Sequence, residues 1–157
     1  MVEEDFLKLC EVWGSLGSFN MDFFRDRLLL QKKVFLLQEI GVDLGYNFRI
    51  YLRGPYSAQL STDGYKINAY ENLSDNLEES IKERIKIINL IGEGHENEAP
   101  WFELVASIAF YSIKEKKSKE EIKKIIFLTK PHLASEEAFE EAYRKLISLN
   151  LVNVPIK

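Results

Sequence analysis

Apolar and polar residues recur with a helical period along most of this chain. Between Ser74 and Gly92, apolar residues fall at intervals of three or four and charged residues fill the positions between them, which is the pattern of an amphipathic helix. Glycine, proline or a capping side chain marks the ends of similar segments. Ser118 with Glu121 has the pattern of a capping box, and Ser135 is the predicted cap of the last helix. The pattern predicts helices over residues 3–13, 21–40, 58–69 and 75–91, a helix that begins at Pro100 and buries Leu104 to Tyr111, and helices over residues 119–129 and 136–149.

The segment from Asn20 to Ile40 is apolar on more than one side, so we expect the helix at the centre of the fold to form here. Asn20 is the predicted N-cap, and Gly41 is placed to end the helix. The apolar positions are Phe24, Leu28, Leu30, Val34, Phe35, Leu37 and Ile40.

Residues 46–52 alternate between apolar and polar side chains, which is typical of a half-buried strand. Gly54-Pro55 is predicted to end this strand, because proline cannot donate to a ladder. Together the patterns predict a mainly α (α+β) fold, a compact bundle of about seven helices with a small β element, as a single helical domain over residues 1–157. The last two helices and an extended tail at residues 151–154 have the outline of a winged helix.

Composition indicates a cytoplasmic protein. The net charge is −4, and the single cysteine, Cys10, excludes an intramolecular disulfide. The acidic N-terminus is unlike a signal peptide, and the apolar run Ile108 to Ile113 is far shorter than the roughly 18 residues that span a membrane. We therefore expect no membrane contact. The richness in Lys, Glu and Ile, with three glutamines, favours a thermophilic source.

Motifs of catalysis and metal binding are missing from the sequence. It contains no Cys-x-x-Cys, HExxH, GxSxG or phosphate-binding glycine loop. His95 lies among glutamates and His132 follows Pro131, and both are interpreted as surface residues. We expect no catalytic residue, no metal and no cofactor. A hydrolase that uses the acidic loop Glu93 to Glu98 is one alternative.

Nucleic-acid binding is the second alternative. A lysine cluster precedes and enters the predicted helix 119–129, and a winged-helix-like DNA-binding transcriptional regulator would contact phosphates through it. Against this, the helix that would read the bases begins with Glu136, Glu137, Glu140 and Glu141, which repel phosphates. The candidate contacts are Lys116, Lys117, Lys119, Lys123 and Lys124.

A cationic and aromatic group surrounds the predicted strand and turn. It suits an acidic peptide or a nucleic acid through cation–π and bidentate contacts, or else the tyrosines pack with their hydroxyls at the rim. Its members are Arg49, Tyr51, Arg53, Tyr56 and Tyr65.

Three short segments carry a family resemblance: Leu30-Gln31-Lys32-Lys33-Val34, Tyr46-Asn47-Phe48, and Gly54-Pro55-Tyr56-Ser57-Ala58-Gln59-Leu60. In these the chain resembles the YwgA-like family of bacterial and archaeal proteins, and it is more distantly similar to the Panacea (SocA-like) antitoxin domain. The resemblance implies a compact helical domain without a known activity, and the antitoxin relatives imply a protein partner. After the turn, Ser61-Thr62-Asp63-Gly64 departs from the antitoxin pattern.

Gln31 is a polar residue in a very apolar helix, and we expect its amide to bond the strand–turn backbone near Gly54. The main hypothesis is therefore a non-enzymatic domain that acts by protein–protein contact or self-association, in an antitoxin-like or defence setting. The structural or partner-binding motif is Gln31, Lys32, Arg49, Tyr51, Arg53, Gly54, Pro55, Tyr56 and Ser57.

Overall fold

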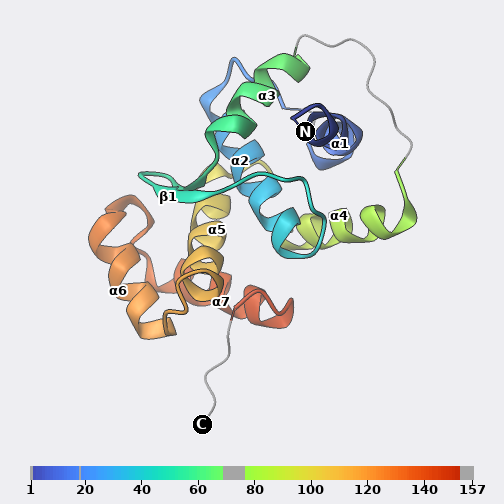
Figure 1. The fold of residues 1–157 in the computed structure, drawn as a ribbon. Helices are drawn as coiled ribbons and strands as arrows, with labels where there is room; N and C mark the ends of the chain where they lie inside the picture. The colour runs from blue at the N-terminus through green and yellow to red at the C-terminus, as the bar shows by residue number, and fades with distance from the viewer. Residues whose placement is uncertain (1, 18, 69–76, 153–157) are drawn as a thin grey trace.

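Helices make up most of the molecule, and a short β-hairpin lies on its surface (Figure 1). The computed structural model describes residues 2–17, 19–68 and 77–152. The mainly helical class with a small β element is confirmed. The elements are α1 (Val2–Leu16), α2 (Phe24–Glu39), β1 (Arg49–Tyr51), β2 (Gly54–Tyr56), α3 (Ala58–Asn68), α4 (Glu79–Ile91), α5 (Ala99–Ile113), α6 (Lys119–Thr129), the 3-10 turn η1 (Pro131–Leu133) and α7 (Glu136–Ser148).

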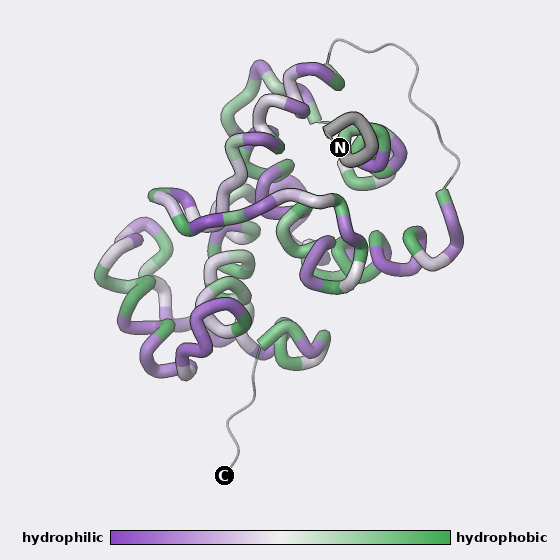
Figure 2. The backbone as a smooth tube through the Cα atoms, viewed as in Figure 1, coloured by the Kyte–Doolittle hydropathy of each residue, from purple (hydrophilic) through white to green (hydrophobic). Residues whose placement is uncertain are grey.

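Helices α2 and α5 pack against each other at the centre of the fold. Helix α5 is the more buried of the two, because apolar residues cover it on every side and most of its side chains are shielded from solvent. The prediction placed α2 alone at the centre. Helices α3 and α4 pack on α2, whereas α6 and α7 pack on α5. Figure 2 shows hydrophobic and hydrophilic residues alternating along α4, α6 and α7, as expected of helices with one buried side.

Several helix ends are fixed by local hydrogen bonds that the sequence predicted. Ser118 and Glu121 form a capping box at the start of α6, and the Ser135 hydroxyl accepts from the Ala138 N–H at the start of α7. Gly41 ends α2 at φ 106°, where the Gly41 and Val42 amides donate to the Gln38 and Leu37 carbonyls. This Schellman arrangement requires a left-handed residue, and glycine adopts it without strain.

The predicted N-cap of α2 is wrong. The helix begins at Phe24, three residues later than expected, and its cap position, Phe23, has no side-chain bond. The Asn20 side chain instead accepts from the Asp22 N–H, while the Asn20 N–H donates to Asp26. Asn20 therefore organises the loop before the helix.

The hairpin corrects the predicted strand over residues 46–52. Strand β1 starts only at Arg49, and Gly54-Pro55 forms the partner strand instead of ending the first one. The antiparallel register pairs Arg49 with Tyr56, Ile50 with Pro55, and Tyr51 with Gly54. Because hydrogen-bonded and non-hydrogen-bonded pairs alternate in such a ladder, Pro55 can occupy a pair that needs no N–H donor.

The C-terminal part contains the expected helix pair, α6 and α7, joined through η1. Residues 149–152 form no strand, and the rest of the predicted tail over residues 151–154 lies outside the described residues. Within the described ranges, none of the helices combines the length and the apolar character that crossing a bilayer requires.

Candidate binding site at the hairpin

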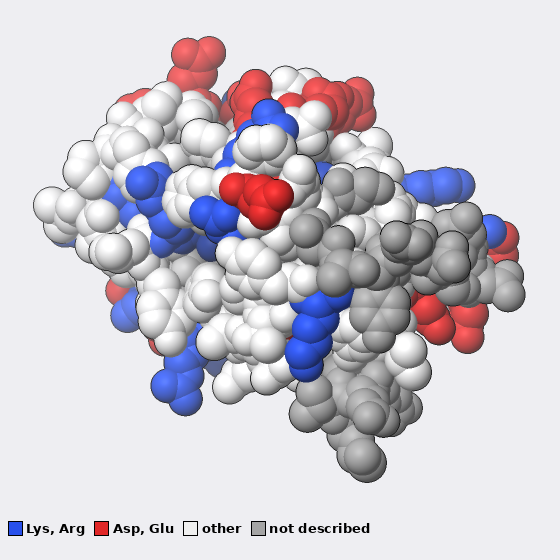
Figure 3. Space-filling model, turned by 90° about the horizontal axis from the view of Figure 1, so that it is seen from above, with Lys and Arg blue, Asp and Glu red and all other residues white. Residues whose placement is uncertain are grey.

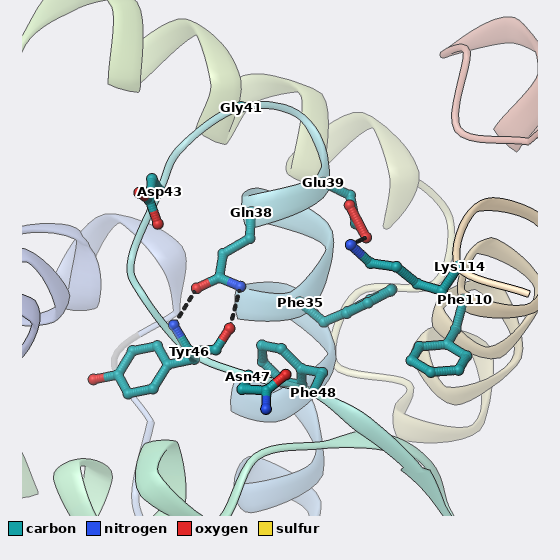
Figure 4. A pocket seen from close by; sticks show the side chains of 10 residues that line it. All are labelled: Phe35, Gln38, Glu39, Gly41, Asp43, Tyr46, Asn47, Phe48, Phe110 and Lys114. Carbon is teal, nitrogen blue, oxygen red and sulfur yellow. Dashed lines mark hydrogen bonds and ion pairs between the residues drawn. The ribbon is translucent and has the colours of Figure 1, made fainter.

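Two glutamines on α2 hold the segment that leads into and out of the hairpin. The Gln31 amide donates to the Ser57 carbonyl at 2.9 Å and accepts from the Ser57 N–H at 2.8 Å. Two turns further along the helix, Gln38 makes the same paired contact with the backbone of Tyr46, at 2.9 Å for both bonds (Figure 4). The structure thus shows the predicted contact of Gln31 with the strand–turn backbone, at Ser57 instead of Gly54.

Lys32 lies under the hairpin and is 1% exposed. Its Nζ donates to the Pro55 carbonyl at 2.7 Å, so the second motif residue of α2 also binds the hairpin backbone. Burial lowers the pKa of Lys32 to about 7, and the positive charge of Lys130 adds to this effect, whereas the negative charge of Glu103 opposes it. Lys32 is therefore a buried structural residue whose amine carries its positive charge in only part of the molecules at neutral pH.

Glu103 of α5 is a buried carboxylate surrounded by basic side chains from α2, from the hairpin turn and from the junction of α6 with η1. We call this group the Glu103 cluster. His132 Nε2 lies 3.0 and 3.2 Å from the two carboxylate oxygens, Lys130 Nζ lies 3.6 Å away, and Arg53 Nη1 lies 3.9 Å away. Glu103 and Lys130 are 1% and 3% exposed. The cluster consists of Glu103, Lys32, Arg53, Lys130 and His132.

Lys130 connects the C-terminal part of the fold to the hairpin turn. Its Nζ donates to the carbonyls of Tyr51 at 3.3 Å and Leu52 at 2.5 Å. Burial lowers the pKa of Lys130 and Arg53 lowers it further, against the opposing influence of Glu103. The turn is therefore held from below by α2 and from the side by the junction of α6 with η1.

Above these anchors, apolar side chains form a depression that we call the hairpin groove. Its volume is about 300 Å³. Leu52 at the tip of the turn is 89% exposed, and Tyr51 and Phe24 are 57% and 53% exposed. An exposed apolar surface around a formed depression marks an interaction site more often than scattered exposed residues do. The groove is lined by Phe24, Leu28, Lys32, Tyr51, Leu52, Arg53, Gly54 and Tyr56.

Arginines surround this groove. The Arg53 and Arg27 guanidinium carbons each lie 5.7 Å from the centre of the Phe24 ring, within cation–π distance. Arg49 is exposed on β1. In Figure 3, the left half of the view shows a group of Lys and Arg side chains among mostly uncharged ones, with Asp and Glu side chains at its edges and near the centre of the view. Of the cationic and aromatic group predicted from the sequence, Arg49, Tyr51, Arg53 and Tyr56 belong to the hairpin, where Tyr51 and Tyr56 meet edge to face at 5.4 Å, whereas Tyr65 lies on α3.

A second depression, of about 420 Å³, lies between α2, α5 and the segment after Gly41 (Figure 4). Three of its polar side chains already have partners. Gln38 is occupied by the Tyr46 backbone, and Glu39 lies 3.0 Å from Lys114 Nζ. These pairings leave the depression less suited to a ligand than the hairpin groove.

The lysine face predicted to touch nucleic acid is partly neutralised by α7. Lys119 Nζ lies 2.8 Å from Glu140, and Lys123 pairs with Glu136. Lys116 and Lys124 are exposed, and Lys117 is half-buried. Two of the carboxylates in the first turns of α7, Glu136 and Glu140, are therefore partners of lysines on α6.

His95 is a bridge between helices and not a solvated loop residue. Its Nδ1 lies 2.8 Å from Glu98 and its Nε2 lies 2.7 Å from Glu141, and the ring stacks on Trp101 at 3.9 Å. Burial, the largest single influence, lowers the pKa of His95, but the hydrogen bonds to Glu141 and Glu98 and their charges together raise it above the ordinary value. Over the described residues, no group of three or more His, Cys, Asp or Glu side chains is arranged to hold a metal ion.

We expect His95 to stabilise the fold most at low pH. A histidine whose pKa is raised on folding contributes fully below its unfolded pKa of about 6.5, and the contribution is lost as the pH rises through the folded value. The measurement is the free energy of unfolding of the wild type minus that of His95→Gln across this range. The difference is needed because the lowered pKa of Lys32 makes stability rise with pH above about 7, in the opposite sense. A difference that stays constant with pH would contradict the assignment.

Three residues of the Glu103 cluster were missed from the sequence: Glu103, Lys130 and His132. One signal was present, because Glu103 is a lone carboxylate within the apolar run Trp101 to Ala106, where a charge needs a buried partner. Comparison of the chain with protein-family models, with curated proteins and with solved structures finds no match in any of the three.

Proposed function

We propose that this chain is a cytoplasmic, non-enzymatic domain that binds another protein in the hairpin groove. The observation that carries the proposal is the hairpin turn, whose backbone is bonded by side chains from two directions while its apolar side chains face solvent. A surface held in one conformation loses little entropy on binding. The occupant is an amphipathic segment whose apolar side chains fill the groove.

Two further observations support a protein partner over nucleic acid. The groove is walled by Leu28, Leu52 and aromatic rings, whereas a nucleic-acid channel needs a continuous cationic track. Part of the lysine face that would supply such a track is already paired with α7. The resemblance to the antitoxin domain, whose relatives bind a protein, agrees with this choice.

Replacement of Leu52 by aspartate is the test of this function. The probe is a display library of short random peptides, selected on the full chain. We expect the selected peptides to bind Leu52→Asp at least tenfold more weakly than the wild type, since a hot-spot residue contributes about 2 kcal/mol or more. Leu128→Asp is the matched control, because Leu128 is 78% exposed on α6 and outside the groove.

Three results would overturn the proposal. The library could yield no peptide whose binding depends on Leu52, or duplex or single-stranded DNA could bind at low salt and lose affinity in Arg53→Gln. Sedimentation could also show self-association that Leu52→Asp abolishes, which would make a second copy of the chain the occupant.

A further inference from the structure

The cations of the Glu103 cluster outnumber its carboxylates. Lys130 and Arg53 both pair with Glu103, whose charge also acts on Lys32, and Glu103 is the one acidic residue of the cluster in the described part of the chain. Lys32 and Lys130 are 1% and 3% exposed, so solvent does little to screen their charges. Buried charges are normally compensated, and a site with surplus buried charge is favourable only when something supplies the opposite sign.

The surplus charge lies beside the hairpin groove. Lys32 and Arg53 belong to the cluster and also line the groove. The side chain of Arg53 is 52% exposed, and its contact with Glu103, at 3.9 Å, involves one nitrogen only. The remaining N–H groups of the guanidinium are arranged as a fork that matches a carboxylate.

We infer that the partner segment carries a carboxylate next to its apolar side chains, and that this carboxylate binds Arg53 and compensates the cationic surplus of the Glu103 cluster. This inference rests on the proposed function, since it names the chemistry of the segment in the same groove. The carboxylate is the side chain of an aspartate or glutamate of the partner.

A change in protonation should accompany binding. The charged groups that act on Lys32 are Glu103 from α5 and Lys130 from the junction of α6 with η1, and Arg53 from the turn and His132 from η1 contact Glu103 in turn. At neutral pH a lysine whose pKa is about 7 is protonated in only part of the molecules. A carboxylate nearby favours the charged form, so binding takes up protons and the affinity falls as the pH rises through 7 and above.

The experiment uses peptides selected from the random library on the full chain. Each acidic residue of a selected peptide is replaced by its amide, and affinities are measured for the wild type, Arg53→Gln and Lys114→Gln. Lys114 is the matched control, because its side chain is also 52% exposed but pairs with Glu39 away from the groove. Calorimetry in buffers of different ionisation enthalpy measures the proton uptake.

We expect that replacing one acidic residue of the peptide by its amide weakens peptide binding to the wild type and to Lys114→Gln by about tenfold or more. The same replacement should weaken binding to Arg53→Gln much less. Selected peptides that bind through Leu52 but contain no such residue would overturn the carboxylate inference and leave the proposed function standing. A library that yields no Leu52-dependent peptide would overturn the proposed function itself.

Discussion

Replacement of Glu103 by glutamine is expected to lower the free energy of unfolding by about 3–5 kcal/mol, the cost of removing one partner from a buried ion pair. Glu103 is 1% exposed, and the amide leaves two buried lysines without a counter-charge. The part of the loss that comes from Lys32 should shrink as the pH rises toward 7, because Glu103 raises the pKa of Lys32 to its value of about 7, and above that pH the lysine is largely neutral with or without Glu103. Urea unfolding at several pH values measures both effects.

An exposed pair provides the control for this prediction. Glu140 meets Lys119 at 2.8 Å, but both side chains are more than a third exposed to solvent. Because solvent screens such pairs, Glu140→Gln should cost about 1 kcal/mol or less. Equal losses in Glu103→Gln and Glu140→Gln would show that the Glu103 cluster is not an energetically buried network.

A double replacement separates the stability of the Glu103 cluster from its role at the hairpin. In the double variant Glu103→Leu with Lys130→Met, both charges of this buried pair are removed together. Much of the stability that Glu103→Gln loses should therefore return. The carbonyls of Tyr51 and Leu52 nevertheless lose their donor, Lys130 Nζ. Peptide binding in the groove should therefore be weaker than in the wild type even though the variant folds well, as expected if the cluster positions the turn.

Local interactions account for what the sequence predicted well. The capping box of Ser118 with Glu121 and the glycine end of α2 at Gly41 depend on neighbours within a few residues, so their geometry follows from the sequence itself. The motif residues Gln31 and Lys32 were also recognisable, because polar side chains in an apolar helix need partners.

The hairpin shows why a local pattern was not sufficient. Residues 46–48 alternate as a strand would, but the Tyr46 N–H and carbonyl are bonded by the Gln38 side chain and do not pair with a strand. Strand β1 therefore begins only at Arg49. The Gln38 side chain lies on α2, eight residues earlier in the sequence, and it takes the backbone groups of Tyr46 that a neighbouring strand would otherwise bond. The alternation of apolar and polar residues does not predict this contact.

The Glu103 cluster could not be assembled from the sequence for a related reason. Its members come from α2, the hairpin turn, α5 and the junction of α6 with η1, and the packing of α5 against the hairpin, α2 and α6 brings them together. The lone carboxylate in α5 predicts that some cation lies nearby, but not which one. His132 is exposed, as the sequence predicted, but its contact with the buried Glu103 depends on how α5 packs and could not be predicted from its neighbours in sequence.

Replacement of Gln31 by leucine is expected to lower the free energy of unfolding by about 2–4 kcal/mol, because two buried backbone groups each lose a partner. Leucine fills a similar volume, so the effect reports the hydrogen bonds to the Ser57 N–H and carbonyl more than a cavity. Gln38→Leu is the matched control. Its pair with Tyr46 is only partly buried, and water can replace the lost bonds there at lower cost.

Hydrogen exchange locates the consequence of this replacement. In Gln31→Leu the Ser57 amide should lose protection, and so should the Leu60 amide, which donates to the Ser57 hydroxyl at the start of α3. Amides of α7 should keep theirs after correction for the global loss, since α7 packs mainly on α5. Uniform loss across the chain would mean that Gln31 supports the whole core. Loss confined to residues 54–60 would show that α2 holds the hairpin as a unit that can open separately.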